Sequence, residues 1–396
     1  MKFLHTADWH VGKTLKGRDR LDEQKAVLNE IVGIAEANEV DAVLIAGDVY
    51  DSTAPSAPAQ QLVVKTLLRL RQTGAQIFVI AGNHDHGPTF EAYRPLMGEI
   101  GITLAGMCRP PEKGGLVRFA SRSDGADAQV AVLPFLSQRY AVRAAEIVAN
   151  TPSQNARAYD EMVRQIVTSL TSGFSGDAVN IVMSHVTCVG GVFGGGERPA
   201  QSIFEYSVPA SIFPISAHYV ALGHLHRRQS LPAQAPVHYS GSPLAVDFGE
   251  QDNRSVVCLV EAAPGIPARV TDIPVTSGRR LRTVHGTLAE LEALAGGFGD
   301  DYLRVYLREP TRAGLRDEIM AVLPNALEVR IDPEFADQAS AKRPGSGEDR
   351  TTRTPAQLFG DFCATRNVSD PRVATLFGEL HDDVTSADSA DLSAAS

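Results

Sequence analysis

The amino-acid sequence predicts an α/β protein, with a parallel β-sheet covered by helices and a smaller α+β unit after it. The first observation behind this prediction is the alternation, from Lys2 to Ala81, of short apolar runs with amphipathic segments of helical length. The second is a shift of composition near residues 275–278, after which a shorter alternating series begins. The third is an ordinary globular composition, 43% hydrophobic and 21% charged, which argues against wholesale disorder.

Three apolar runs predict the first strands, at Phe3–Ala7, Ala42–Ala46 and Ile77–Ala81. The segments between them, 21–37 and 60–72, place apolar residues three and four positions apart, which is typical of helices packed on a core. This alternation of strands and helices is typical of parallel strands joined by crossover helices. A further helix is expected at 155–170, and further strands are expected at Val130–Leu133, Ile181–Ser184, Tyr219–Leu222, Val237–Ser240 and Ser255–Val260.

The region after residue 277 predicts a small unit of three strands and two helices, alternating at 280–284, 288–294, 302–307, 312–322 and 327–331. The polar segment that follows contains Gly and Pro and is typical of a linker. Two short helices with apolar faces are expected after it, the first opened by Thr354-Pro355. We therefore expect a large domain at 1–277, a small α+β domain at 278–333, a linker at 334–354, a helical hairpin at 355–383 and a disordered tail at 384–396.

Charge and cysteine content exclude some classes of protein. The 396 residues include 37 Lys and Arg against 47 Asp and Glu, which gives a formal charge of −10. The chain therefore cannot bind nucleic acid through its net charge alone, and any such contact must be local, mediated by metal or shared with a partner. No apolar run approaches the roughly 18 residues that a membrane helix needs. The four cysteines lie far apart without a Cys-x-x-Cys pair, which is typical of reduced thiols. We therefore expect a cytoplasmic protein with no membrane association.

Metal-ligating residue types follow five of the predicted strands. They are Asp8 and His10, then Asp48, then Asn83 with His84, then His185, and finally His224 and His226. Because the carboxyl ends of the strands in an α/β sheet form one rim where ligands bind, these side chains are expected to converge. Carboxylate, amide and imidazole groups without thiolates suit Mn, Fe or Zn, and the set is too large for one ion. Two ions need a bridging carboxylate, and Asp48 on the central strand is the natural bridge.

The ordered set D-x-H, G-D-x-x-D, G-N-H-D, a histidine after a strand, and G-H-x-H resembles the motifs of the metallophosphoesterase superfamily. Within it, Asp8-Trp9-His10-Val11-Gly12 and Gly223-His224-Leu225-His226-Arg227 are similar to the SbcD family of exonuclease subunits. The resemblance implies a β-sandwich flanked by helices for the large domain and a DNA-capping role for the small one. It also implies two-metal hydrolysis of DNA phosphodiester bonds in DNA repair and recombination. The activities implied are an ATP-dependent exonuclease on double-strand ends and an endonuclease on single strands and hairpins.

The resemblance also implies roles for individual residues. One metal ion would be held by Asp8, His10, Asp48 and His226, and the other by Asp48, Asn83, His185 and His224. Both ions would be divalent, with Mn²⁺ favoured over Mg²⁺. His84 would act on the scissile phosphate as a general acid or as an electrostatic stabiliser. Asp51 and Asp85 would be hydrogen-bond acceptors that fix the orientation of imidazoles.

Other features point to partners. Arg227 and Arg228 follow the last ligand and are candidates for contact with a DNA phosphate, the alternative being ordinary solvated surface charge. The helical hairpin at 355–383 is too small to bury its apolar faces alone, and the resemblance implies that it binds a coiled-coil ATPase of the SbcC type. That partner would handle ATP, because this sequence contains no credible P-loop. A homodimer within a heterotetramer is expected from the same resemblance.

Two other functions are consistent with parts of this pattern. Another metallophosphoesterase, such as a cyclic-nucleotide phosphodiesterase or a phosphatase, would share the metal ligands but would not need residues 279–382. A non-catalytic scaffold of the same fold would be expected to lose ligands, whereas the full set and His84 are present here. Activity on small phosphoesters with none on DNA would favour the first alternative.

Overall fold

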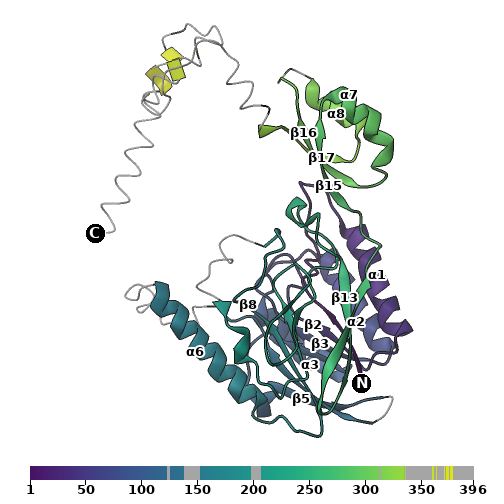
Figure 1. Ribbon diagram of the computed structural model, residues 1–396, viewed down its shortest axis with the longest axis vertical. Coiled ribbons are helices and arrows are strands. Elements are labelled where there is room, and N and C mark those ends of the chain that lie inside the picture. Colours follow the sequence, from purple (N-terminus) through teal and green to yellow (C-terminus); the bar gives the residue numbers. More distant parts are fainter. Residues whose placement is uncertain are drawn as a thin grey trace. The chain divides into compact units, whose positions relative to one another are not determined.

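The computed structural model describes residues 1–122, 125–137, 152–197, 207–310, 312 and 314–333, and beyond these 335, 359–360, 363, 370, 372–373 and 375–377. The chain divides into two compact units, Met1–Asp332 and Pro333–Ser396. Figure 1 labels helices and strands of the first unit. Apart from Phe335, the expected linker and tail lie outside the described residues. Among the residues that are described, no helix is both long enough and apolar enough to cross a membrane.

The first six-stranded sheet contains the N-terminal strands. Its members are β1 (Lys2–Thr6), β2 (Ala42–Ile45), β3 (Gln76–Ile80), β4 (Ile102–Ala105), β13 (Val256–Ala263) and β14 (Ile266–Pro274), in the order β14-β13-β1-β2-β3-β4. They are connected in part by the helices α1 (Leu21–Ala37), α2 (Ala57–Gln72) and α3 (Gly87–Glu99). Strands β1, β2 and β3 run parallel, as predicted, and β4, which was not predicted, continues the parallel pairing, whereas β13 pairs antiparallel with β1.

A second six-stranded sheet holds the remaining strands of the large domain. It contains β5 (Leu116–Ala120), β6 (Asp127–Leu133), β7 (Val179–His185), β10 (Tyr219–Gly223), β11 (Gln229–Leu231) and β12 (Val237–Tyr239), in the order β11-β12-β10-β7-β6-β5. Additional elements near it are the helix α6 (Pro152–Thr171) and the short strands β8 (Thr187–Cys188) and β9 (Ser207–Val208). The sandwich implied by the resemblance is therefore confirmed. The parallel sheet expected for residues 2–81 is also confirmed, and the later strands are divided between the two sheets by long-range pairing.

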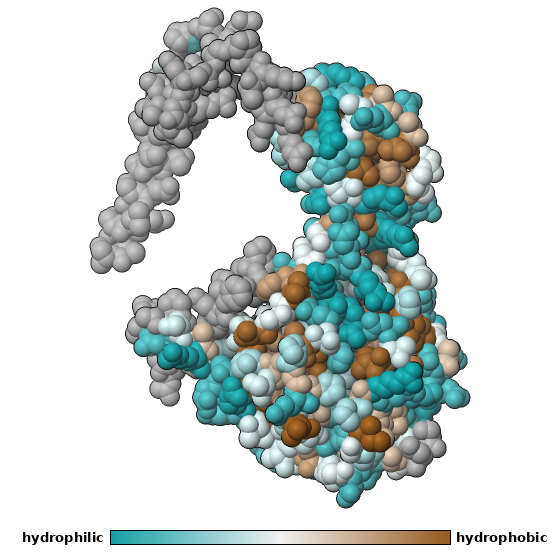
Figure 2. Space-filling view, in the orientation of Figure 1, coloured by the Kyte–Doolittle hydropathy of each residue, from teal (hydrophilic) through white to brown (hydrophobic). Residues whose placement is uncertain are grey.

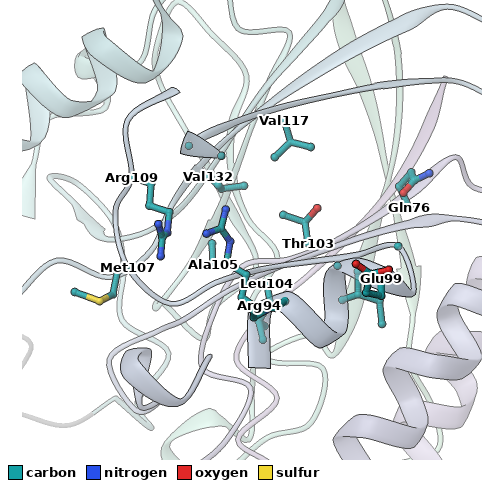
Figure 3. A pocket seen from close by; sticks show the side chains of 16 residues that line it. Gln76, Arg94, Glu99, Thr103, Leu104, Ala105, Met107, Arg109, Val117 and Val132 are labelled. Carbon is teal, nitrogen blue, oxygen red and sulfur yellow. The ribbon is translucent and has the colours of Figure 1, made fainter. Parts of the chain in front are cut away.

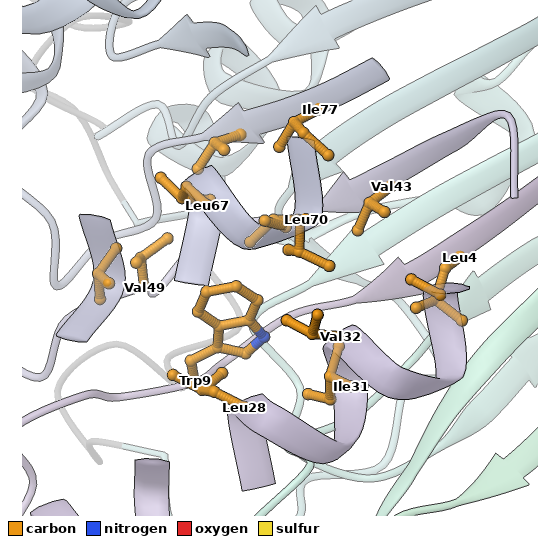
Figure 4. Close-up of a cluster of buried hydrophobic side chains, with 14 of the residues drawn as sticks. Leu4, Trp9, Leu28, Ile31, Val32, Val43, Val49, Leu67, Leu70 and Ile77 are labelled. Atoms are coloured by element: carbon orange, nitrogen blue, oxygen red, sulfur yellow. The ribbon is translucent and has the colours of Figure 1, made fainter. Parts of the chain in front are cut away.

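The sandwich is held by three apolar layers. Side chains from both sheets fill the space between them, among them Phe3, Phe78 and Met183. Helices α1 and α2 pack on the outer face of the first sheet around Trp9 and its apolar neighbours (Figure 4). Helix α6 covers the outer face of the second sheet. Because β2 is buried on both faces, its sequence reads as a continuous apolar run instead of alternating with polar residues.

Residues 278–332, for which we keep the name small domain, are part of the first compact unit. They contain a three-stranded parallel sheet, β15 (Leu281–Gly286), β16 (Tyr302–Leu307) and β17 (Ala326–Ile331), in that order. The helices α7 (Leu288–Leu294) and α8 (Leu315–Val322) pack on one face of it. A capping box formed by Thr287 and Glu290 begins α7. An apolar contact of Leu15, Phe248, Leu281 and Tyr302 joins this sheet to the rest of the first compact unit.

Two cavities lie away from the strand-end histidines. One, of about 400 Å³, borders the edge strand β4 and is lined in part by Arg94, Thr103 and Arg109 (Figure 3). The other, of about 420 Å³, lies at the junction with the small domain and includes Arg254 and Arg279. The surface over this junction is mainly hydrophilic (Figure 2). Neither cavity is lined by the predicted metal ligands.

The second compact unit is described only in part. The described residues between 359 and 377 are helical except for Asp370. The rings of Phe359 and Phe377 are stacked, with their centroids 4.0 Å apart. Most of the expected helical hairpin lies outside the described residues.

Candidate metal centre

Strand ends from both sheets bring their polar side chains together. Strands β1, β2 and β3 belong to the first sheet, and β7 and β10 belong to the second. Three groups of buried ligands result, each with its ligand atoms within 4.8 Å of one another. The groups are Asp8, His10 and His226, then His10, Asp48 and His84, and finally Asp48, His185 and His224. Every carboxylate and imidazole predicted as a metal ligand therefore lies in at least one group.

The Asp48 carboxylate is shared by two of these three groups. Its Oδ2 lies 3.4 Å from His185 Nε2, 3.7 Å from His10 Nε2 and 4.0 Å from His84 Nε2. Its Oδ1 accepts a hydrogen bond of 2.8 Å from the backbone N–H of His84. One carboxylate that faces imidazoles of separate ligand groups is the arrangement that a bridge between two cations requires.

Electron-pair donors face one another on both sides of Asp48. The amide Oδ1 of Asn83 lies 2.9 Å from His185 Nε2 and 2.8 Å from His224 Nδ1. The Nε2 atoms of His10 and His226 are 3.0 Å apart. Such buried polar atoms are costly unless a proton or a cation lies among them. The donor set fits divalent cations bound through oxygen and imidazole nitrogen.

Hydrogen bonds to backbone carbonyls determine which ring nitrogen faces the centre. A carbonyl oxygen only accepts, so His185 Nδ1 donates to Ala46 O and His84 Nδ1 donates to Asp51 O, each at 2.8 Å. In both rings Nε2 is thereby left on the side of Asp48. Because each ring is held by its Nδ1–H, Nε2 points into the centre without a further ordering cost.

Four of the ligand residues have strained backbones. The angle φ is +54° at Asp8, +45° at His10, +48° at Asp48 and +99° at His224, a region that residues with a Cβ seldom adopt. Each such residue costs on the order of 1–3 kcal/mol and persists only where its surroundings hold it. One holding contact is the Asp8 carboxylate, whose Oδ1 accepts from the backbone N–H of His224 at 3.0 Å. The concentration of strain at the ligands indicates a functional site.

The two sheets touch at Gly223, the last residue of β10. A Cβ at this position would lie 1.9 Å from Ala46 O, next to the end of β2. Any side chain would therefore push the two strand ends apart. The close approach that glycine permits brings His224 and His226 from the second sheet to Asp48 of the first.

Burial and neighbouring charges shift the pKa values of the cluster. Burial raises the pKa of Asp8 to about 7. Burial alone would lower the pKa of His185, but the Asp48 carboxylate beside it raises that pKa to about 9. In the same way, Glu250 outweighs burial and raises the pKa of His226 to about 10. Without a cation, the two histidines therefore carry protons that a divalent ion would displace on binding.

Two glutamates that the sequence did not indicate surround His226. Glu250 accepts from His226 Nδ1 at 2.5 Å and from the backbone N–H of Val246 at 2.8 Å. Glu197 accepts from the backbone N–H of His226 at 2.9 Å and from that of Gly194 at 2.6 Å. Neither glutamate follows a strand or stands at a fixed spacing from the histidines, so no local pattern points to them.

The aspartates expected to orient imidazoles have different surroundings. Asp51 Oδ1 lies 3.7 Å from His10 Nδ1 and 3.1 Å from Lys13 Nζ. Asp85 instead accepts hydrogen bonds from three backbone N–H groups, those of Val49, Tyr50 and Gly82. The expectation that Asp85 orients an imidazole is wrong, because these donors turn its carboxylate toward the loops after β2 and β3.

The two arginines after the last ligand also differ. The side chain of Arg227 is exposed and can reach a ligand outside the protein. The side chain of Arg228 is only 11% exposed, and its Nε lies 2.7 Å from Asp272 Oδ1. It also donates to Tyr239 O at 3.2 Å. The contact of Arg228 with DNA stays a prediction, and the binding of its guanidinium within the fold disfavours it.

Comparison with known families agrees with this geometry. Residues 1–228 match the family described as calcineurin-like phosphoesterase. Residues 277–367 match a family described as the C-terminal domain of the type 5 capsule protein repressor. The fold and the cluster of ligands thus define a calcineurin-like phosphoesterase.

Three similar proteins are each named as the SbcD subunit of the nuclease SbcCD. The chain is 40% identical over 285 residues to that of Bacillus subtilis (strain 168), which covers 71% of either chain. It is 33% identical over 394 residues to that of Rhodobacter capsulatus, covering 91% of this chain and 93% of the relative. It is 29% identical over 303 residues to that of Escherichia coli (strain K12), covering 74% and 73%. The chain belongs to the family of SbcD subunits of the SbcCD nuclease and is a metal-dependent nuclease.

Proposed function

We propose that the chain binds two divalent cations at the buried cluster, with Mn²⁺ preferred over Mg²⁺. One cation would be held by Asp8, His10, Asp48 and His226, and the other by Asp48, Asn83, His185 and His224. The observation that carries this proposal is the position of Asp48 Oδ2, 3.7 Å from His10 of the first set and 3.4 Å from His185 of the second. The preference for Mn²⁺ rests on the imidazole content of both sets, since Mg²⁺ favours oxygen ligands and water.

The proposed role of His84 is proton transfer to the scissile phosphate group. Bound divalent cations would supply positive charge that neutralises the phosphodiester in the transition state. His84 is 7% exposed, and its Nδ1–H is occupied by Asp51 O, so Nε2 is the atom available to a substrate. From there a protonated Nε2 would donate to the leaving oxygen, or would stabilise a phosphate oxygen by a hydrogen bond.

Replacing His84 with alanine tests this role. DNA cleavage should be lost, while the metal content, measured by elemental analysis, should stay near two ions per chain. His86→Ala is the matched control, because His86 lies two residues further on, is exposed, and has its Nδ1 2.7 Å from Thr89 Oγ1. The control should cleave DNA like the wild type. Wild-type cleavage by His84→Ala would contradict the assigned role, and one ion per wild-type chain would contradict the pair of cations.

The proposed substrate is DNA, attacked as part of a complex with a coiled-coil ATPase of the SbcC type. In that complex the chain acts as an ATP-dependent exonuclease on double-strand ends and as an endonuclease on single strands and hairpins, in DNA repair and recombination. Supporting this, the relatives are named as the SbcD subunit of the SbcCD nuclease. The proposed location is the cytoplasm, and the four free cysteines are consistent with it.

The proposed binding segment for the ATPase is 355–383. The stacked rings of Phe359 and Phe377 support an apolar hairpin there. Deleting residues 355–396 should leave Mn²⁺-dependent nuclease activity intact and should abolish co-purification with the co-expressed ATPase. Co-purification of the shortened chain would refute this segment as the binding site.

A homodimer through α2 and α3 is the proposed arrangement of the nuclease chains. A groove of about 590 Å³ between these helices is lined mainly by apolar side chains, including Val63, Phe90 and Tyr93. Leu96 beside it is 63% exposed. Leu96→Glu should shift the chain from dimer to monomer in sedimentation velocity, whereas Ile266→Glu on β14, at a residue 61% exposed, should not. A dimer that survives Leu96→Glu would place the interface elsewhere.

A further inference from the structure

One face of the small sheet is only partly covered. In β16 the alternate residues from Leu303 to Leu307 pack against α7 and α8, so Tyr302, Arg304 and Tyr306 lie on the opposite face. At one end of that face, Tyr302 is buried against Phe248. This apolar cluster does not extend to the other end of the face among the described residues. The β16 side chains toward that end, Arg304 and Tyr306, are polar or aromatic.

The outermost row on this face crosses all three strands. His285, Tyr306 and Arg330 are cross-strand neighbours in the sheet register. The rings of His285 and Tyr306 are stacked, with centroids 5.0 Å apart and planes inclined by 21°. His285 Nδ1 lies 2.9 Å from Asp332, which holds the imidazole in this orientation, and the His285 side chain is 42% exposed. Because β15 is an edge strand among the described strands, the outer face of this imidazole has no cross-strand neighbour.

The charge around this row is positive. The charged side chains there are Lys16, Arg304, Arg308 and Arg330, against Asp332 and Glu328. Arg308 Nε lies 3.0 Å from Asp332 Oδ2, and Arg330 forms an ion pair with Glu328. Their side chains are nevertheless 50% and 61% exposed, so each guanidinium keeps a side that a bound anion can reach. The chain as a whole has a formal charge of −10, and this surface is therefore a local exception. A local exception is what binding of a polyanion by such a chain requires.

The same face leads to the metal centre. The Arg304 guanidinium lies over the Phe248 ring, 5.2 Å from its centroid. Phe248 is the first residue of a short 3₁₀ turn, η5 (Phe248–Glu250), and Glu250 accepts the hydrogen bond from His226. The backbone N–H of Thr283 donates to Gln251 just after this turn, at 2.9 Å. The aromatic row and the metal ligands are thus connected through a few residues in direct contact.

We propose that this face binds an unpaired base of single-stranded DNA, stacked on the outer face of His285, with Arg308 and Arg330 beside the phosphates. Ring faces stack with every type of base, so binding would not depend on sequence. In a duplex the faces of a base are covered by its neighbours, so the row would select unpaired DNA such as a hairpin loop or a frayed end. This inference rests on the proposed nuclease function, for which it specifies the form of the substrate.

Binding of the full-length chain to a single-stranded oligonucleotide tests the proposal. The oligonucleotide contains a fluorescent adenine analogue that is quenched on stacking, and a chelator prevents cleavage. His285→Ala should weaken binding about tenfold and reduce the quenching, because the ring that stacks on the base is lost. Tyr306→Ala removes the ring behind His285 and should weaken binding less, because the imidazole loses the neighbour that supports it. Tyr306→Phe keeps the ring and should bind like the wild type. Binding of the matching blunt duplex should be unchanged in all three variants.

Charge is tested separately with a matched pair. Arg330→Ala should weaken single-strand binding, whereas Arg316→Ala, at an exposed residue of α8 on the other side of the same sheet, should not. Wild-type affinity in His285→Ala, an equal loss for duplex and single strand, or equal losses in the two arginine variants would overturn the proposal. Mn²⁺-dependent hydrolysis of bis-(p-nitrophenyl) phosphate reports on the metal centre alone. Its absence in the wild type would refute the proposed function without affecting the binding result.

Discussion

Gly82, in the loop after β3, allows the Asp48 carboxylate to occupy the middle of the metal centre. A Cβ at Gly82 would lie 2.1 Å from Asp48 Oδ1 and 2.3 Å from the Asp48 backbone nitrogen, whereas ordinary contacts begin at 3.4 Å. In Gly82→Ala the carboxylate must therefore retreat by more than an ångström. A misplacement of about 1 Å in a catalytic group can lower the rate about a hundredfold. We expect a loss of that order in kcat, with an overpacking cost to stability of about 1–3 kcal/mol.

The assay compares Mn²⁺-dependent nuclease activity, metal content and thermal denaturation of Gly82→Ala with those of Gly33→Ala. Gly33 lies within α1, and a Cβ there would meet no atom within 4 Å. Gly33→Ala should keep full activity and gain about 0.5–1 kcal/mol of stability, because alanine favours the helix. Full activity and full metal content in Gly82→Ala would refute the inference that metal binding and cleavage depend on the present position of the Asp48 carboxylate.

Three further outcomes are expected. Mn²⁺ affinity should rise with pH from neutral to mildly alkaline, because His185 and His226 must release protons when the ion binds. Their pKa values without metal are about 9 and about 10. Calorimetric titration at several pH values checks this. Glu250→Gln should flatten that pH dependence and, at the alkaline end, weaken binding about 10–100-fold, since the carboxylate that orients His226 is lost; an unaltered titration would count against the role of Glu250. Arg228→Ala should destabilise the fold by about 3 kcal/mol in urea denaturation, because the Asp272 carboxylate loses its partner. Arg227→Ala should weaken only DNA binding. A stable Arg228→Ala variant together with a destabilised Arg227→Ala variant would contradict this assignment.

The positions of the metal ligands could be predicted from sequence because their signal is local. Asp8, Asp48 and His185 each stand at or just beyond the end of a buried strand, and an apolar run followed by such a residue is visible without knowledge of the fold. Parallel strands place their carboxyl ends together, which converts a pattern along the chain into proximity in space. Whether these side chains bind metal as assigned remains a prediction.

The contacts that support the ligands could not be predicted, because they join residues without a fixed spacing. Glu250 reaches His226 across 24 positions of sequence, and Asp272 reaches Arg228 across 44. Arg227 and Arg228 look alike in the sequence, and the partner of Arg228 on a distant strand makes one buried and leaves the other exposed. The division of strands between two sheets is also set by long-range pairing, for which the individual strands contain no signal.

The η5 turn connects the small domain to the candidate metal centre. Phe248 at its start is clamped between Leu281 and the Arg304 guanidinium, and Glu250 at its end holds the imidazole of His226. Only one residue separates Phe248 from Glu250 in this turn. A rotation of the small domain would therefore either break the contacts of Phe248 or displace the imidazole of His226, a predicted metal ligand. A partner protein or DNA that rotates the small domain would thereby change the position and the hydrogen bond of His226. Binding at the small domain would in this way be coupled to the geometry of the predicted metal ligands.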